Sequence, residues 1–489
     1  MDKKEKINSK KEKNLTGLIS EKEKSLALFC MEAARRHGAC QVRVSLSKSV
    51  LDSYSMLNGE LDKVAHSADR SIFLYVFADG KYGTFSTNML EEAELDRFTA
   101  QAVTSVRMLA EDRHRRLPEL SRTADDAITG REPGLYDGTY EDMSSEDRLQ
   151  LAENECIFKN IAADAAHQDA DASCDSGSLR DRQFRVISEE CEYSDSVDDN
   201  FTADSNGFRG RHTETSFAIC SEITIESDGK KYSGYWWDSS PFLAGLQKGK
   251  CSETALEKAL SQIGPKRHSG GTLNMVVDRS VSSRLISPVI SALNAASIQQ
   301  ESSFLKDSLG KKVFCDGFTL VDLARTPGKP GTRFFDTEGV ATHDMDIIRE
   351  GTVKTWFINT YMALKMGMEP TVEGVSRPVV LPYSAGICSD GSVLQGRFGA
   401  AEMISECGSG IYVTGFNGGN CNPTTGNFSY GIEGFAFRNG KITHPVREMV
   451  ITGNMTELWN NLKAAGNDAR PCTRWQIPSL YFADVFFSA

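Results

Sequence analysis

The sequence predicts an α+β protein with an N-terminal helix/antiparallel-sheet domain and a strand-rich C-terminal domain that has a long central helix. Three observations predict this class. At 489 residues the chain is too long for one ordinary core. Apolar residues alternate along several segments joined by Asn-Gly and Asp-Gly pairs, which favour β-hairpins. Other segments carry apolar residues at helical spacing, so a sheet can bury one face against helices.

The first predicted helix begins after Ser20, which forms a capping box with Glu23, and ends near Arg36 with Gly38 as the stop signal. A strand with one apolar face follows at 41–47, and "SIFLYVF" at 71–77 predicts a second strand between two turn signals, "MLNGEL" and "FADGKYG". A second helix is predicted from the spacing of Leu95, Phe98, Ala102, Val106 and Leu109.

Residues 118–138 read as a connector, 145–164 as a helix, 167–183 as a polar loop, and 184–240 as alternating strands. A helix capped by Ser252 and stopped by Gly264 comes next. The C-terminal part then predicts a buried strand at 272–278, a long helix over 280–310, several strands, a helix over 455–465, and a last strand at 479–487. We therefore expect a lysine-rich tail at 1–19 and domains at 20–250 and 251–489.

Composition excludes several classes of function. The formal net charge of −12 argues against direct nucleic-acid binding, which needs a cationic surface. No window approaches the roughly 18 apolar residues that span a bilayer, so no membrane partner is expected. The 12 cysteines are scattered without a C-x-x-C pair, and together with the absence of a secretory signal pattern this predicts a cytoplasmic protein.

The spacing of histidines argues against a local metal site. The nearest two of the eight, His37 and His66, are 29 residues apart, so no H-E-x-x-H helix exists. There is also no G-x-S-x-G elbow and no phosphate-binding glycine motif. We predict no catalytic residue, no metal ligand and no cofactor in this chain.

The stretch "GFNGGNCNPTTGNFSYGIEG" at 415–434 is rich in glycine and asparagine. It has too few carboxylates for a metal loop. One interpretation is that its glycines permit positive φ in turns and bulges between strands. The other is that they leave a backbone surface that a second chain approaches closely.

Several blocks in the same order resemble the TldD/PmbA family. They include "NPTTGNFSYGIEGFAFRNGKITHPVREM" from Asn422, "SSFLKDSLGKKVF" from Ser302, and "FFDTEGVATHDMD" from Phe334. Shorter matches at "GKYGTFSTN" and "SNGFRGRHTETSFAICSEI" extend the resemblance over most of the chain from about Ser20 onward.

The resemblance implies a two-subunit peptidase in which one subunit, TldD, binds zinc through H-E-x-x-x-H on a helix just before the "SSFL" block. Counting back from that block without a gap puts Ile286 and Ser291 in place of the two histidines and Ser287 in place of the glutamate. None of these can bind zinc or act as the general base. The chain therefore resembles the metal-free TldE (PmbA) subunit, and Cys472 has no histidines with which to share a metal.

The resemblance thus implies a non-catalytic subunit that is inactive alone, with zinc expected only in a TldD-like partner of a heterodimer. Peptides or unfolded polypeptides would be the substrates, and a homodimer is possible in isolation. The alternative is a non-enzymatic regulatory protein of the DNA gyrase modulator type. We expect a set of residues in the glycine-rich stretch to line the partner- or peptide-facing surface: Gly418, Gly419, Asn422, Thr425 and Gly426.

Overall fold

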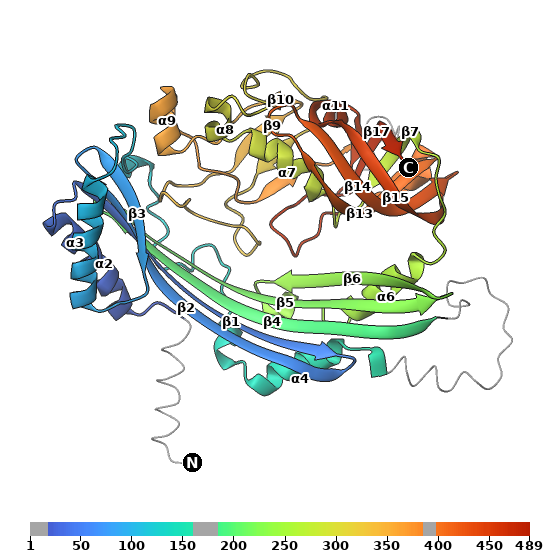
Figure 1. The fold of residues 1–489 in the computed structure, drawn as a ribbon, viewed down its shortest axis with the longest axis horizontal. Helices are drawn as coiled ribbons and strands as arrows, with labels where there is room; N and C mark the ends of the chain where they lie inside the picture. The colour runs from blue at the N-terminus through green and yellow to red at the C-terminus, as the bar shows by residue number, and fades with distance from the viewer. Residues whose placement is uncertain (1–17, 160–183, 385–397) are drawn as a thin grey trace, which may run out of the picture. The chain divides into compact units, whose positions relative to one another are not determined.

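The computed structural model describes residues 18–159, 184–384 and 398–489, and Figure 1 shows their fold. These residues form two compact units, one ending at Ile263 and also holding Pro327–Lys329, the other holding Gly264–Thr326 and Pro330–Ala489. The α+β class is confirmed. Among the described residues, no helix has the length and apolar character needed to cross a membrane. The predicted loop at 167–183 and the predicted tail up to residue 17 lie outside the described ranges.

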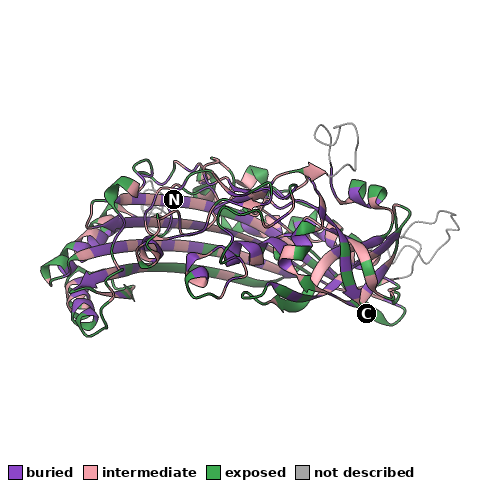
Figure 2. Cartoon of the chain, turned by 90° about the horizontal axis from the view of Figure 1, so that it is seen from above, coloured by how far each residue is buried: buried purple, intermediate pink, exposed green. Residues whose placement is uncertain are grey.

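The first unit is built on one antiparallel sheet with the strand order β3-β2-β1-β4-β5-β6. Buried residues alternate with partly buried or exposed ones along β4 and β5, and Figure 2 shows this alternation as colour bands on the long strands. The predicted Asn-Gly and Asp-Gly hairpins are present, with positive φ at both residues of each pair. The strand bounds are β1 (Gln41–Leu57), β2 (Glu60–Ala78), β3 (Lys81–Thr87), β4 (Arg185–Asp204), β5 (Arg209–Ser227) and β6 (Lys230–Ser240).

Helices α2 (Glu21–Arg36) and α3 (Glu92–Arg107) pack against each other and against β1, β2 and β3 (Figure 1). The predicted capping box at Ser20 is present, because its side chain accepts from Glu23 N and the Glu23 carboxylate accepts from Ser20 N. Ile19 was assigned to the tail, yet it is buried, and its backbone N–H donates to the Asp199 carboxylate. Ile19 therefore belongs to the packed part of the first unit, not to the predicted tail.

Helix α4 (Ser145–Glu155) packs on β4 and β1 and ends before Cys156, whereas the predicted helix continued to 164, of which residues 160–164 lie outside the described ranges. Helix α6 (Cys251–Ser261) packs on β5 and β6. This packing places α6 with the first unit, so the chain divides at Ile263 rather than at the predicted 250. The prediction that Ser252 caps α6 is wrong, because Lys250 is at the cap position and its side chain forms no capping hydrogen bond. Short 3-10 turns complete the unit at Leu120–Arg122, Gly138–Asp142 and Leu243–Gly245.

The second unit contains a seven-stranded sheet with the order β12-β16-β17-β15-β14-β13-β7, and β17 also pairs with β7. The five strands from β17 through β7 therefore close into a ring. These strands are β7 (Gly271–Val277), β12 (Tyr383–Ser384), β13 (Gly410–Cys421), β14 (Asn427–Arg438), β15 (Lys441–Asn454), β16 (Leu462–Ala465) and β17 (Leu480–Ser488). A four-stranded sheet of order β10-β9-β8-β11 lies in the same unit, from β8 (Leu320–Asp322), β9 (Met345–Arg349), β10 (Thr352–Val353) and β11 (Pro378–Val380).

The expected long central helix is wrong in its length. The chain forms α7 (Ser283–Ala292), breaks at Asn294, and continues as α8 (Ala295–Gln299). Asn294 has an extended backbone and its side chain accepts from Ala296 N, so it caps a new helix instead of continuing the old one. The other helices of the unit are α9 (Thr360–Met366), α10 (Ala400–Cys407) and α11 (Met455–Asn460), the last ending before the predicted residue 465 because β16 follows.

Candidate functional site

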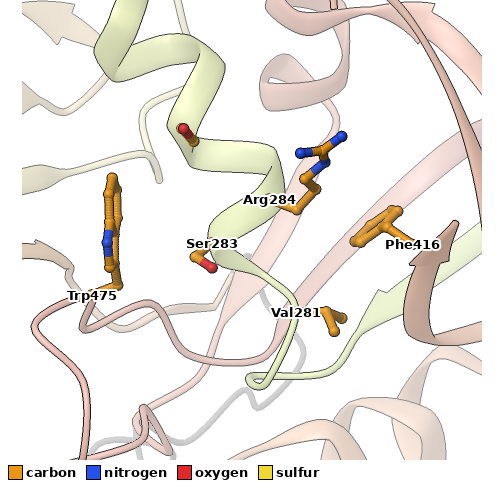
Figure 3. Close-up of a pocket in the computed structure, with 6 residues that line it drawn as sticks. Val281, Ser283, Arg284, Phe416 and Trp475 are labelled. Atoms are coloured by element: carbon orange, nitrogen blue, oxygen red, sulfur yellow. The ribbon is translucent and has the colours of Figure 1, made fainter. Parts of the chain in front are cut away.

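A recess of about 530 Å³ lies beside the first turn of α7 in the second unit. Figure 3 shows Arg284 and Phe416 on one side of this turn and Trp475 on the other. The recess therefore joins three parts of the chain: the start of α7, strand β13, and the segment before β17. Its lining residues are Val281, Ser283, Arg284, Ser287, Phe416 and Trp475.

Helix α7 presents a polar face to this recess because its apolar residues are used by the core. Leu285, Ile286 and Val289 are fully buried in the hydrophobic cluster that packs against the seven-stranded sheet. Ser283, Arg284 and Ser287 fall on the remaining face. The buried Ser282 hydroxyl donates to Ile477 O at 3.1 Å and so fixes the helix start to the segment that leads into β17.

Counting back from Ser302 aligned three positions with the zinc motif, namely Ile286, Ser287 and Ser291. Their side chains do not point to one common place. Ile286 points into the core, whereas Ser287 and Ser291 are exposed. Only Ser287 lines the recess. None of the described residues that line it is a histidine, cysteine, aspartate or glutamate, so the recess does not offer the ligands that zinc requires.

Arg284 supplies the positive charge of the recess. Its Nη2 donates to Gly419 O at 3.2 Å, and its guanidinium lies 5.1 Å from the centre of the Tyr430 ring. Phe416 meets the same ring edge-on with a centroid distance of 5.8 Å. Burial raises the pKa of the Tyr430 hydroxyl, so this ring is neutral at physiological pH. The result is an aromatic surface with one exposed guanidinium held above it.

Strand β13 has an open edge next to Arg284. It pairs with β14 along its length, but with β7 only over Gly410–Val413. From Gly415 to Cys421, its second edge pairs with no strand within the described ranges. Such an edge leaves backbone N–H and C=O groups available to another extended chain.

Two register shifts in the β13–β14 ladder distort this edge, and the second falls between Asn417 and Asn420. Gly418 and Gly419, which lie inside it, have φ of 66° and 78°. A Cβ on Gly419 would come within 2.0 Å of Ser429 O, whereas one on Gly418 would meet nothing within 4 Å. Gly419 therefore permits close backbone approach, and Gly418 only the turn geometry.

The structure places the remaining predicted site residues in a turn between β13 and β14. The Asn422 side chain accepts from Thr424 N at 2.9 Å and Thr425 N at 3.2 Å, and Thr425 O accepts from Asn454. Asn422 and Thr425 are exposed, as are Gly418 and Gly419. Gly426 is buried against the Phe304 ring and so does not face solvent.

Sequence reasoning missed Arg284, Phe416 and Trp475. Arg284 stands two residues before Ile286, on the polar side of an amphipathic helix, and that position was a usable signal. Phe416 lies inside the glycine-rich stretch but is not itself unusual in a strand. Trp475 is brought to the site only by the tertiary fold.

Two segments of the chain match models of known protein families. Residues 270–489 match the PmbA/TldA metallopeptidase C-terminal domain, and residues 42–106 match PmbA/TldA metallopeptidase domain 1. The chain is 25% identical to the metalloprotease PmbA of Escherichia coli O157:H7 over 450 residues, which cover 90% of this chain and 91% of that protein.

Solved structures resemble the whole fold. A crystal structure from Bacteroides thetaiotaomicron, provisionally described as a modulator of DNA gyrase, is 37% identical with a TM-score of 0.85 and covers 96% of this chain and 100% of its own. TldE from Thermococcus kodakarensis has a TM-score of 0.76 at 16% identity, covering 94% of this chain and 99% of its own, which shows similarity of fold.

Proposed function

Because this chain belongs to the PmbA/TldD metallopeptidase family, we propose that it is the subunit without the catalytic metal in a two-subunit zinc metallopeptidase. The complex would cleave peptides or unfolded polypeptides. In this proposal a TldD-like partner supplies the zinc and the general base, and this chain supplies part of the surface that holds the substrate.

The observation that carries the proposal is the side-chain chemistry of the recess beside α7. A hydrolytic zinc site uses imidazoles, carboxylates or thiolates, and it places a carboxylate to take a proton from the bound water. Here the polar face offers the hydroxyls of Ser283 and Ser287 and the guanidinium of Arg284. A permanent positive charge at this place repels a metal cation. The recess does not fit zinc, and no hydrolytic step is assigned to it.

The same groups are suited to holding a peptide. An extended substrate can add to the open edge of β13 through main-chain hydrogen bonds, which need no particular sequence. Arg284 stands beside that edge and has further N–H donors besides the one directed at Gly419 O. Phe416 and Trp475 supply apolar surface for a substrate side chain. These features support binding of varied peptides, as a degradative enzyme requires.

Free thiols such as those of Cys30 and Cys191 support a reducing compartment. We therefore place the complex in the cytoplasm. This part of the proposal is independent of the recess.

A second candidate function comes from one comparison. The similar structure from Bacteroides thetaiotaomicron is provisionally described as a modulator of DNA gyrase. On that basis this chain would be a non-enzymatic binding protein. Its net charge of −12 disfavours direct contact with DNA, so a protein would be the target.

One experiment separates the two functions. The chain is purified alone and together with a TldD-like chain from the same cell, and cleavage of an unfolded peptide is measured for each subunit and for the mixture. The subunit proposal predicts a stable complex and cleavage by the mixture only. A TldD-like chain that neither binds this chain nor gains activity from it would favour the regulatory function.

A further inference from the structure

A second cluster of chemically reactive side chains lies in the first unit, where α4 ends on the sheet. Cys156 directly follows α4, and Glu189 and Cys191 lie two residues apart on β4. Residues at that spacing in a strand share one face of the sheet. The two sulfur atoms and a carboxylate oxygen of Glu189 all lie within 4.8 Å of one another. Glu189 is completely buried and Cys191 is 2% exposed.

The backbone after α4 holds these three groups together. The Glu189 carboxylate accepts from Ile157 N at 3.0 Å and from Phe158 N at 2.8 Å, so the residues next to Cys156 are fixed to β4. Asn58 in the β1–β2 turn accepts from Glu189 N at 2.9 Å and fixes the strand from the other side. A carboxylate has about four lone-pair positions, and these bonds leave some of them unused.

The cluster contains one carboxylate and two thiols. Glu189 forms no ion pair with any described residue. A buried carboxylate such as that of Glu189 is stable when it is hydrogen-bonded or coordinates a cation.

We propose that Cys156, Glu189 and Cys191 form a binding site for a thiophilic divalent cation, with Zn²⁺ as the preferred ion. Thiolates favour zinc over magnesium or calcium, and tetrahedral zinc accepts mixed sulfur and oxygen ligands. The Ser252 hydroxyl lies 3.2 Å from Cys191 Sγ, at the edge of the cluster. This site is separate from the recess beside α7, and it was not expected from the sequence.

Binding is an exchange of protons for metal, without oxidation. Without metal, the Cys156 thiol donates to Ala152 O at 3.5 Å and the Cys191 thiol donates to Ser221 Oγ at 3.6 Å. When zinc binds, both thiols release their protons to solvent and form two zinc–sulfur bonds, while Glu189 contributes an oxygen. The two thiolates and the carboxylate carry three negative charges, one more than the two positive charges of the ion. The bound ion ties the end of α4 to β4.

The test uses cobalt as a spectroscopic probe for the zinc site. The purified, reduced full chain is titrated with Co²⁺, and the thiolate-to-cobalt charge-transfer absorption is recorded. We expect one equivalent to give this absorption and Zn²⁺ to displace it. The Cys156→Ser/Cys191→Ser double variant should lose the absorption, and Cys220→Ser on the neighbouring strand should keep it.

Three further measurements guard against a misfolded double variant. Cys156→Ser alone changes a half-buried residue at the end of a helix, and it should weaken binding with an unchanged circular dichroism spectrum. Glu189→Gln should keep the sulfur absorption but weaken cobalt binding by more than the roughly 10- to 100-fold typical of an outer-shell change. Zinc should raise the melting temperature of the wild type and not that of the double variant.

The proposal is wrong if the reduced wild type gives no charge-transfer absorption, or if the folded double variant gives the same absorption as the wild type. It does not depend on the proposed peptidase function. Metal binding here with no cleavage by the isolated chain is consistent with both proposals.

Discussion

The guanidinium of Arg284 on α7 donates to the carbonyl oxygen of Gly419 on β13 across 3.2 Å. This contact joins the first turn of α7 to the strand whose edge is open. In the proposed function, this cation braces an edge that binds peptide. We therefore propose that the recess binds substrate and takes no part in hydrolysis.

Removing this cation tests that assignment. Arg284→Ala should lower the kcat/KM of the two-subunit complex by about 5- to 30-fold, mostly through KM, because one charge-assisted hydrogen bond contributes roughly 1–2 kcal/mol. Steady-state kinetics with an unfolded peptide measures this. Arg438→Ala, an exposed arginine at the far end of β14, is the matched control and should change neither constant.

The bulge at Gly419 gives a second test. Gly419→Val places a side chain against Ser429 O and requires a β-branched residue at φ 78°, so β13 should separate locally from β14. We expect a loss of about 2–4 kcal/mol in the free energy of unfolding, together with weaker partner binding and peptidolysis. Gly418→Ala, which adds a side chain in open space, should lose only about 1 kcal/mol. Unchanged partner binding and peptidolysis in Gly419→Val would remove this edge from the proposed surface.

The start of α6 is capped from another helix. The buried Glu155 carboxylate accepts from Gly249 N at 2.7 Å and Ser252 N at 3.1 Å. Glu155→Gln replaces one acceptor by an amide donor that faces these N–H groups. We expect a loss of about 1–3 kcal/mol in urea unfolding of the first unit. The exposed neighbour Glu153→Gln should leave the midpoint unchanged, and an equal effect of both variants would refute the capping role.

The first helix of the sheet unit predicts a pH dependence. Burial acts to raise the pKa of Glu23, but hydrogen bonds from Ser20 and Arg70 and the charge of Lys48 lower it to about 2. Because the folded pKa lies below the unfolded value near 4.5, the stabilisation is complete above pH 4.5 and is lost as pH falls toward 2.

The comparison is between the wild type and Glu23→Gln in urea unfolding at pH 7 and pH 3. At pH 7 the free energy of unfolding of the wild type should exceed that of Glu23→Gln by about 1–2 kcal/mol after allowance for solvent screening. This difference should be smaller at pH 3. An advantage that is the same at both values would show that the Glu23 charge does not stabilise the fold.

Local signals in the sequence predicted local structure well. The capping box at Ser20 and the Asn-Gly pair at Asn58 each contain the chemistry that fixes their geometry, and both are present as predicted. The break at Asn294 was missed because helical spacing continues through it, although the asparagine side chain can cap a new helix. Helix propensity alone does not show whether a helix continues through such a residue or ends there.

Long-range arrangements could not be predicted in the same way. Glu155 caps α6 from 96 positions away, and no signal near Ser252 indicates this. Trp475 reaches the recess only because the ring of strands brings the segment before β17 beside α7. Gly426 was grouped with its exposed neighbours because it shares their composition, but the Phe304 ring covers it. Partners that are distant in sequence decide each of these positions.

The most direct test of the central claim is the hydrolysis of an unfolded peptide by this chain alone, supplied with excess Zn²⁺, and again after addition of a TldD-like chain. The account predicts no hydrolysis above background for the chain alone, and hydrolysis by the pair that is weakened by Arg284→Ala. Hydrolysis by the isolated chain at a rate similar to that of the pair would contradict it.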